Sequence, residues 1–414
     1  MKDRLFSLFF SCSCRFESKI ELSSKAYKGG HSYERRELYF LGSRPPQQAG
    51  AHERKKDKMD EAGRERYFTI EKHLLNVYDK NSRKLGLSAE NTKEHQEWKK
   101  KLREVLSEIS GLTRMEASDL KPEVLEVEQC DGYLRKKVIL QTEPDVWMPT
   151  YVLIPDDLKE QEQRASIITP HGHGGGGKEG VAGRTEMLPI KEGIKKYNAD
   201  YGVQLVRAGY IVFCPDARGA GERRESMLQG NKAEQLLGSS CNELNNIAIS
   251  LGQSLMGMWV WDLRRLIDYI ETCSICNPEA IGCCGFSGGG WQTLWLTALD
   301  DRIKCAVVSG YFHGFKGTIF KTNKCGCNYI PHLWEYIDIG DLGALIAPRP
   351  LLIESGAKDP LNGERGLEDV REQVEITRRA YQLYGSEQQL YHHVFDGAHQ
   401  WNGEKTLEFL KSWL

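Results

Sequence analysis

The chain lacks any excess of charge of one sign, because 56 Lys and Arg stand against 58 Asp and Glu. Such a balance offers no broad basic field for nucleic acid or anionic lipid. Long hydrophobic runs are also missing, since no apolar stretch approaches the ~18–20 residues that a membrane-spanning helix needs. We therefore expect neither a nucleic-acid partner nor a membrane partner, and the sequence leaves the oligomeric state open.

The twelve cysteines lack the spacing of a small disulfide scaffold. Several of them, such as Cys214, Cys283 and Cys305, fall inside apolar runs. A reduced thiol behaves there as a small hydrophobe. The apolar stretch near the start, Leu5 to Phe10, is shorter than the apolar region of an ordinary signal peptide. We therefore expect a reducing, cytoplasmic setting.

No internal repeat is present, and 414 residues are enough to bury a large core. Residues 1–58 are polar and show little periodicity, so we predict a disordered segment or an over-extended start, with Met59 as the natural first residue. Residues 59–125 are predicted to form a helical extension. In it, Leu102 and Leu106 share one apolar stripe, and Gly111 suits the end of the helix.

Residues 126–414 alternate between strands and helices. Strands are expected at 136–142, 149–155, 165–170, 211–219, 280–286, 303–310, 349–356 and 389–397. Helices are expected at 201–210, 257–272, 291–299, 370–385 and 403–414. The first two strands are joined by a short link and should be antiparallel. The others are separated by helices, which predicts an α/β fold with a mostly parallel sheet covered on both faces.

A glycine-rich stretch, HGHGGGGKEG at 171–180, fits three kinds of site. Gly172, Gly177 and Lys178 match the phosphate-binding pattern GxxxxGK, but Glu179 stands where Ser or Thr should follow. Gly172, Gly174 and Gly177 match the dinucleotide pattern GxGxxG. The third possibility is the His-Gly loop of a serine hydrolase, which supplies an amide to an oxyanion.

The surroundings of the stretch favour the third possibility. The residues after Lys178 make a poor helix start, whereas a phosphate loop leads into a helix. A dinucleotide site needs an acidic residue about 20 positions on, but the next strand ends at Asp216, 39 residues after Gly177. We therefore expect Lys178 and Glu179 to be surface residues that stabilise the loop.

A nucleophile motif follows in the next part of the chain. Gly285, Ser287 and Gly289 form GxSxG between an apolar strand and an apolar-periodic helix. A serine on such a strained strand-to-helix turn presents its hydroxyl above the sheet, and small residues two positions away let the turn close. Ser287 is the predicted nucleophile, and the backbone N–H of Gly288 is a predicted oxyanion donor.

A serine nucleophile needs a base and a group that orients the base. His399 follows the last expected strand, and Asp359 follows the strand before it, so the order is Ser, Asp, His as in α/β-hydrolases. Alternatives to Asp359 remain open, and they are Glu354, Asp341 and Glu335. The adjacent His392 and His393 lie inside a strand and are interpreted as ordinary strand residues.

Two cysteine pairs raise the question of zinc. Cys273 and Cys276 form CxxC, and Cys325 and Cys327 form CxC. Neither pair is followed by a clean pattern for the remaining ligands. We therefore expect no metal and no other cofactor.

Taken together, these blocks resemble the α/β-hydrolase superfamily, and more narrowly its acetyl-xylan-esterase-like and dienelactone-hydrolase-like branch. The quoted loop, "DARGAG" at 216–221, "GFSGG", "SGAKDP" and "FDGAHQW" stand in that branch's usual order. The resemblance covers 126–414. It implies that the second oxyanion amide belongs to His173, and that Asp216 and Arg218 brace the loop after their strand.

The implied reaction is cleavage of a small-molecule carboxylic ester, such as an acetyl ester of a sugar, through an acyl-enzyme on Ser287. A peptidase of the prolyl-oligopeptidase type and a lactone hydrolase remain alternatives. A non-enzymatic scaffold is less favoured because every catalytic position is filled. Inserts at 222–254 and 311–340 are expected to shape the substrate pocket.

Overall fold

The computed structural model describes residues 69–322 and 324–414. The prediction for residues 1–58 and for a start at Met59 lies outside these residues. The fold is therefore known for the part of the chain that begins at Thr69.

A nine-stranded sheet has the order β1-β2-β3-β5-β4-β6-β7-β8-β9. The strands are β1 (Glu123–Cys130), β2 (Tyr133–Glu143), β3 (Val146–Pro155), β4 (Arg164–Ile168), β5 (Ile211–Pro215), β6 (Cys276–Phe286), β7 (Ile303–Ser309), β8 (Leu351–Gly356) and β9 (Leu390–Phe395). Strands β1, β2 and β3 pair antiparallel, β3 also pairs antiparallel with β5, and the rest of the sheet is parallel. The predicted fold class is confirmed.

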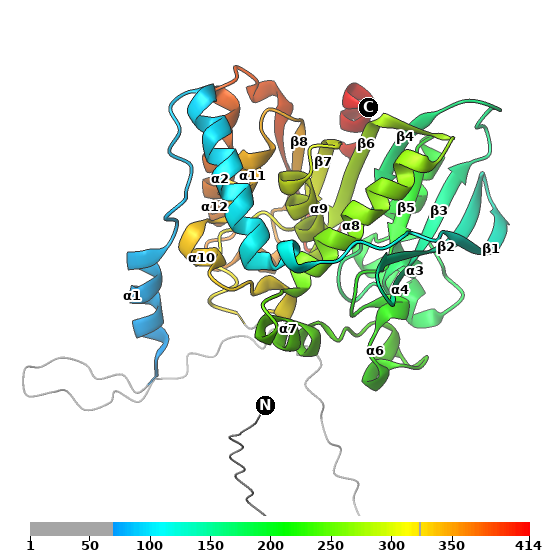
Figure 1. Cartoon of the computed structure of the whole chain (residues 1–414), viewed down its shortest axis with the longest axis horizontal. Coiled ribbons are helices and arrows are strands. Elements are labelled where there is room, and N and C mark those ends of the chain that lie inside the picture. The colour runs from blue at the N-terminus through cyan, green and yellow to red at the C-terminus, as the bar shows by residue number, and fades with distance from the viewer. Residues whose placement is uncertain (1–68, 323) are drawn as a thin grey trace, which may run out of the picture. The chain divides into compact units, whose positions relative to one another are not determined.

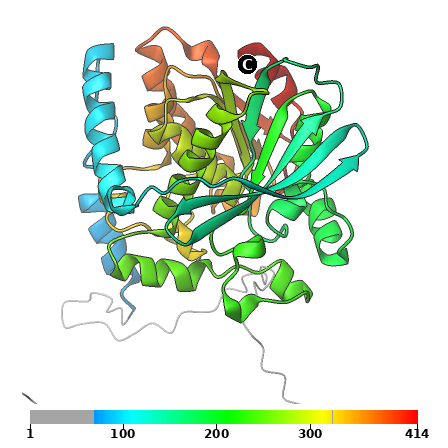
Figure 2. The ribbon, with the colours of Figure 1, turned by 45° about the vertical axis from the view of Figure 1, so that its right-hand side comes forward.

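Strand β1 was not expected from the sequence. Its apolar residues Val124, Leu125 and Val127 are exposed, and the other positions of the strand include four acidic or amide residues. An edge strand packed on one side only needs no apolar alternation, so its pattern resembles that of a loop. Figure 2 shows the β1–β3 ribbon at the far side of the sheet from α2.

Thirteen helices accompany the sheet in the described residues. They are α1 (Glu71–Asn81), α2 (Thr92–Ser110), α3 (Lys178–Val181), α4 (Leu188–Tyr197), α5 (Tyr201–Arg207), α6 (Ala233–Leu236), α7 (Cys241–Ser250), α8 (Leu255–Thr272), α9 (Gly288–Leu299), α10 (Leu333–Tyr336), α11 (Ile339–Ile346), α12 (Leu367–Gln382) and α13 (Thr406–Trp413). The five helices expected within 126–414 all occur. Those in the two inserts were not expected.

Alternate strand residues face opposite layers of helices, as the two-residue period of a strand requires. Ile211 and Phe213 of β5 pack in the cluster that includes α8, whereas Val212 and Cys214 pack in the cluster that includes α5 and α13. Helices α9, α11 and α12 pack in a third cluster together with β7 and β8. Both faces of the parallel strands are therefore apolar, which explains their continuous hydrophobic runs.

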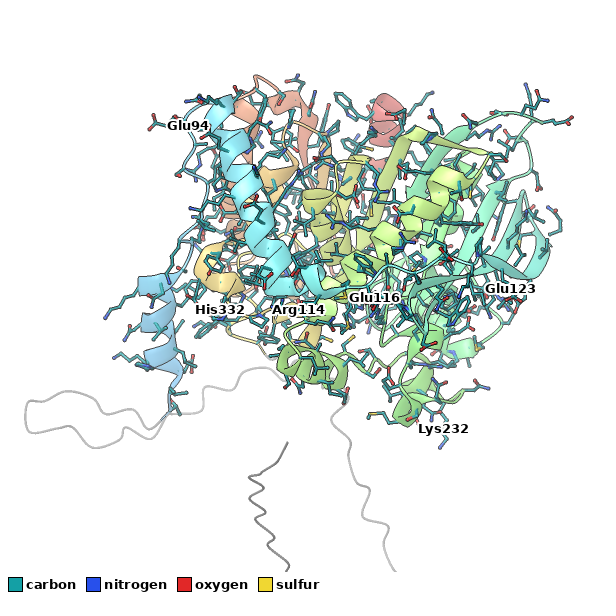
Figure 3. All side chains as sticks on the ribbon, in the orientation of Figure 1. Glu94, Arg114, Glu116, Glu123, Lys232 and His332 are labelled. Carbon is teal, nitrogen blue, oxygen red and sulfur yellow. The ribbon has the colours of Figure 1, made fainter. Side chains whose placement is uncertain are left out.

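Helix α2 forms an outer layer over α8, α9 and α11 (Figure 1). Leu102 and Leu106 are fully buried on its predicted stripe. Its first turn is capped by the side chain of Asn91, and it ends at Gly111, whose φ of 79° suits glycine. Figure 3 marks Glu94 at the start of α2 and Arg114 just beyond its end.

Among the described residues, no helix combines the length and the apolar character needed to cross a membrane. The longest ones, α2 and α8, are amphipathic and pack on one side.

We predict that a buried histidine of α2 makes the folded protein less stable as the pH falls. His95 is fully buried between Tyr384 Oη and the carbonyl oxygen of Ala344, and burial, with a smaller contribution from Lys99, lowers its pKa to about 4. As the pH falls from about 6.5 towards 4, the unfolded chain takes up a proton at this histidine and the folded chain does not. Stability should fall in that window by up to about 1.4 kcal/mol per pH unit.

The variant His95→Gln should therefore lose less unfolding free energy between pH 7 and pH 5 than the wild type does. Chemical denaturation at both pH values measures this difference. His73→Gln, at an exposed histidine of α1, is the control for the loss of a histidine at the surface. Equal slopes for His95→Gln and the wild type would contradict the prediction.

Candidate active site

The GxSxG segment forms a sharp turn between β6 and α9. Ser287 has φ 57° and ψ −123°, a conformation that L-residues rarely adopt. Its amide donates to the carbonyl oxygen of Ser309 at 2.8 Å, and its own carbonyl accepts from Trp291 in the first turn of α9. Ser287 is partly exposed although Phe286 and Gly288 beside it are buried. The turn therefore presents this side chain at the carboxyl end of the sheet.

The glycines of the motif are required by close backbone contacts. A Cβ on Gly285 would collide with the carbonyl of Gly289, and one on Gly289 would collide with the carbonyl of Pro170. A Cβ on Gly172 would come within 2.8 Å of the Phe286 oxygen. The His-Gly loop and the serine turn thus touch backbone to backbone, which only glycine permits.

The structure brings the three predicted catalytic side chains together. His399 Nε2 lies 2.9 Å from Ser287 Oγ, and His399 Nδ1 lies 2.7 Å from Asp359 Oδ2. Nδ1–H donates to the carboxylate, which leaves Nε2 free to accept from the hydroxyl. The His399 ring packs against Phe286 with their centroids 4.6 Å apart, which limits its freedom to turn.

Asp359 serves two partners with its two oxygens. Oδ1 accepts from the amide of Leu361 at 2.8 Å, at the start of the short turn η5 (Pro360–Asn362), while Oδ2 faces His399. The Asp-Pro turn therefore holds the carboxylate in place. The side chain is almost fully buried, so few water molecules compete for it.

The alternatives to Asp359 lie in other interactions. Glu354 accepts from Thr406 Oγ1 and from the amide of Gly403, and burial raises its pKa. Asp341 pairs with Arg83, and Glu335 pairs with Lys84. None of these three carboxylates has a hydrogen bond to His399 in the described part of the chain.

The His-Gly loop, residues 170–173, is held from several sides. His171 Nε2 accepts from the amide of Ala217 at 3.0 Å, and its Nδ1 donates to the carbonyl of Gly172 at 2.9 Å. Burial lowers the pKa of His171, in keeping with a neutral ring that donates at one nitrogen and accepts at the other. Gln292 Nε2 of α9 also donates to the His171 carbonyl.

His173 lies directly against the serine turn. A Cβ on Gly288 would approach its Nδ1 to 2.7 Å, so ring and turn are in contact. Both predicted oxyanion residues are therefore neighbours, and the amide of Gly288 begins α9. The N-terminus of a helix favours negative charge.

Lys178 is fully buried, which makes the prediction of a surface position wrong. Its Nζ is hydrogen-bonded to Asp216, Glu179 and Glu222, and its amide donates to Asp216 Oδ1. Burial opposes its charge, but Asp216, followed by Glu179 and Glu222, raises its pKa overall. Three carboxylates make this possible, because a buried charge is tolerated when it is paired.

The prediction that no helix follows the loop is also wrong, since the single-turn helix α3 begins at Lys178. A phosphate loop is nevertheless disfavoured. The lysine that such a loop directs at phosphate is occupied here by carboxylates of its own chain.

The "DARGAG" segment forms the brace that the resemblance implied. Asp216 holds the loop through Lys178, while Arg218 pairs with Glu143 and with the buried Asp262. Burial alone would raise the pKa of Asp262, but Arg218 brings it well below its usual range. The segment therefore ties β5 to α8.

The sequence did not indicate two residues that lie near the triad, His313 and Lys324. His313 is buried in the loop after β7, and its Nδ1 contacts Thr318 Oγ1. Burial lowers the pKa of His313 to about 4. Burial also lowers the pKa of Lys324, on which the charge of Asp359 acts. No sequence motif distinguishes these positions, because a loop of irregular structure brings them to the site.

The family comparison agrees with this geometry. The pattern that defines the Abhydrolase family matches residues 61–408. The chain belongs to this family. The membership confirms the predicted α/β-hydrolase resemblance.

Individual relatives of this abhydrolase are distant. YtaP of Bacillus subtilis (strain 168), named as a hydrolase, is 27% identical over 258 residues, which span 61% of this chain and 79% of YtaP. A Bacteroides fragilis NCTC 9343 protein named as an acetyl xylan esterase has a similar crystal structure, with a TM-score of 0.67 and 20% identity, covering 82% of this chain and 84% of that one.

A glucuronoyl esterase from Teredinibacter turnerae T7901 has a TM-score of 0.56 and 16% identity, covering 80% of the abhydrolase and 88% of that chain. At these identities the likeness to the two esterases is one of fold.

The geometry predicts which carboxylate activates Ser287. In Asp359→Asn the retained oxygen still accepts from Leu361, but the neutral amide no longer favours the tautomer with a proton on Nδ1. The rate at which a fluorophosphonate labels Ser287 should fall about 10³- to 10⁴-fold. Glu354→Gln is the matched control and should change the rate by less than about tenfold. The reverse order would assign the orienting role to Glu354.

Proposed function

We propose that this abhydrolase is a serine hydrolase that cleaves carboxylic esters through an acyl-enzyme on Ser287. The observation that carries the proposal is the continuous chain from Ser287 Oγ through His399 to Asp359, with distances of 2.9 and 2.7 Å. A serine, a base and an orienting carboxylate in this order are the parts that acyl transfer needs.

The reaction begins when His399 Nε2 takes the proton of Ser287 as Oγ bonds to the ester carbonyl carbon. The tetrahedral intermediate collapses as the carbon–oxygen bond to the alcohol breaks and His399 gives that alcohol its proton. A water molecule, deprotonated by His399, then attacks the acyl carbon. The bond from that carbon to Ser287 Oγ breaks, His399 returns the proton to Oγ, and the acid is released. Asp359 stays ionised and orients the imidazole throughout.

The negative charge on the carbonyl oxygen would be held by the amides of Gly288 and His173. The contact between Gly288 and the His173 ring supports this pairing, because it brings the two backbone segments together beside Ser287. Amides fixed before the reaction need no reorganisation as charge develops, and one such donor contributes about 10²- to 10³-fold in rate.

The substrate class is suggested by the relatives that share the fold. The esterases among the fold relatives, named for acetyl xylan and glucuronoyl esters, point to sugar esters. An acetylated sugar is therefore the proposed substrate class, and the buried thiols favour a cytoplasmic setting.

The first test compares the wild type with Ser287→Ala. The variant should take up no fluorophosphonate label and should hydrolyse p-nitrophenyl acetate at least about 10³-fold more slowly, because no acyl-enzyme forms. Ser412→Ala, at an exposed serine of α13, is the control and should match the wild type. If Ser287→Ala is labelled or turns over as fast as the wild type, the proposed mechanism fails.

The second test addresses the substrate class with acetylated sugars, lactones and dipeptide amides. The kcat/KM should be highest for the acetylated sugars, because the esterases that share the fold are named for sugar esters. A preference for dipeptide amides would identify a peptidase, and a preference for lactones would identify a lactonase, with the same three catalytic residues.

A further inference from the structure

Four metal-binding side chains from separate segments converge behind the serine turn. They are His173 of the glycine-rich loop, Cys241 at the start of α7, and Cys325 and Cys327 around the turn η4 (Gly326–Asn328). One ligand atom from each lies within 4.8 Å of the other three. Three thiols and one imidazole are the Cys₃His set found in structural zinc sites.

The distances within this cluster fit tetrahedral coordination. Zn–S bonds of about 2.3 Å and Zn–N bonds of about 2.0–2.1 Å place a sulfur and a nitrogen ligand about 3.6 Å apart at the tetrahedral angle. His173 Nε2 lies 3.5 Å from Cys241 Sγ and 3.7 Å from Cys327 Sγ. These two distances match the spacing around one zinc ion, and Cys325 Sγ lies within 4.8 Å of the same atoms.

We propose that His173, Cys241, Cys325 and Cys327 bind one Zn²⁺ ion in a structural site next to the catalytic serine. The cysteines bind as thiolates, so their protons pass to solvent as the metal enters. Four protein ligands complete the coordination and leave no position for water or substrate, which separates this ion from the chemistry at Ser287.

Hydrogen bonds outside the ligand set keep the cysteine turn in place. The amide of Gly326 donates to Asn242 Oδ1 at 2.6 Å, which joins the turn to α7. Asn328 Nδ2 donates to the carbonyl of Cys325 at 2.8 Å and also lies 3.6 Å from Cys327 Sγ. An N–H directed at a ligand sulfur is a common feature of the surroundings of a metal site.

The site explains how two inserts and the active-site loop are joined. Cys241 belongs to the insert 222–254, and the CxC pair belongs to the insert 311–340. The metal would fix both to the ring of His173, which touches Gly288. The proposal replaces the expectation that no metal is bound. The sequence did not indicate this site because two of the four ligands are far from the CxC pair along the chain.

The other cysteine pair provides a matched control. Cys273 and Cys276 lie at the end of α8 and the start of β6, and no such group of three or more metal-binding residues includes them in the described residues. Cys273 is partly buried like Cys325, so Cys273→Ser tests whether any cysteine substitution alters metal content.

The test measures metal in the full chain purified under reducing conditions and incubated with zinc, then freed of unbound metal. Mass spectrometry of the elements should find about one zinc per chain in the wild type and in Cys273→Ser. It should find at most about a tenth of that in Cys325→Ser, Cys327→Ser and Cys241→Ser. Cobalt in place of zinc should give the intense visible bands of a tetrahedral thiolate site.

A second measurement needs no variant and so does not depend on how the variants fold. In the zinc-loaded wild type, Cys241, Cys325 and Cys327 should resist alkylation, and a chelator should expose them. Zinc-free wild type after incubation, full zinc in Cys327→Ser, or a disulfide among these cysteines in the reduced preparation would each overturn the proposal. These readouts require no turnover and are independent of the proposed ester hydrolysis.

Discussion

The backbone contact between the serine turn and the His-Gly loop is the constraint on which the rest of the site depends. Ser287 holds a positive φ, and the residues around it leave no room for side chains where Gly289 meets Pro170 and where Gly172 meets Phe286. Such strain persists only where the surrounding structure over-determines it. The surroundings here are a parallel sheet buried on both faces, whose strand ends carry both turns.

The loop side of this contact is fixed by charges as well as by packing. Lys178 is surrounded by Asp216, Glu179 and Glu222, and Asp216 in turn accepts from two backbone amides. Loss of one partner of such a buried pair leaves an uncompensated charge and costs about 3–5 kcal/mol. A loop held this firmly is suited to presenting amides in one fixed geometry, which is what stabilisation of an oxyanion requires.

The proposed catalytic residues could be predicted from the sequence because each one belongs to a local pattern. Ser287 lies between an apolar strand and an apolar-periodic helix, and both Asp359 and His399 follow strands, so the common edge of a parallel sheet brings them together. No comparable local pattern predicts the burial of Lys178 or the presence of strand β1. The burial of Lys178 depends on Asp216 and Glu222, which are 38 and 44 residues away. The sequence of β1 lacks a regular apolar alternation because the sheet ends there.

The position of His173 shows why local sequence patterns did not predict the four-ligand cluster. Its ligand partners Cys241, Cys325 and Cys327 are 68, 152 and 154 residues away along the chain, so no spacing rule for zinc sites applies. The same residue is assigned a backbone role at the oxyanion and a side-chain role at the metal. These roles are compatible because the ring and the amide leave the Cα in different directions. A metal on the ring would then restrict the backbone of the residue whose amide must be held still, so that the structural site and the catalytic site share one constraint.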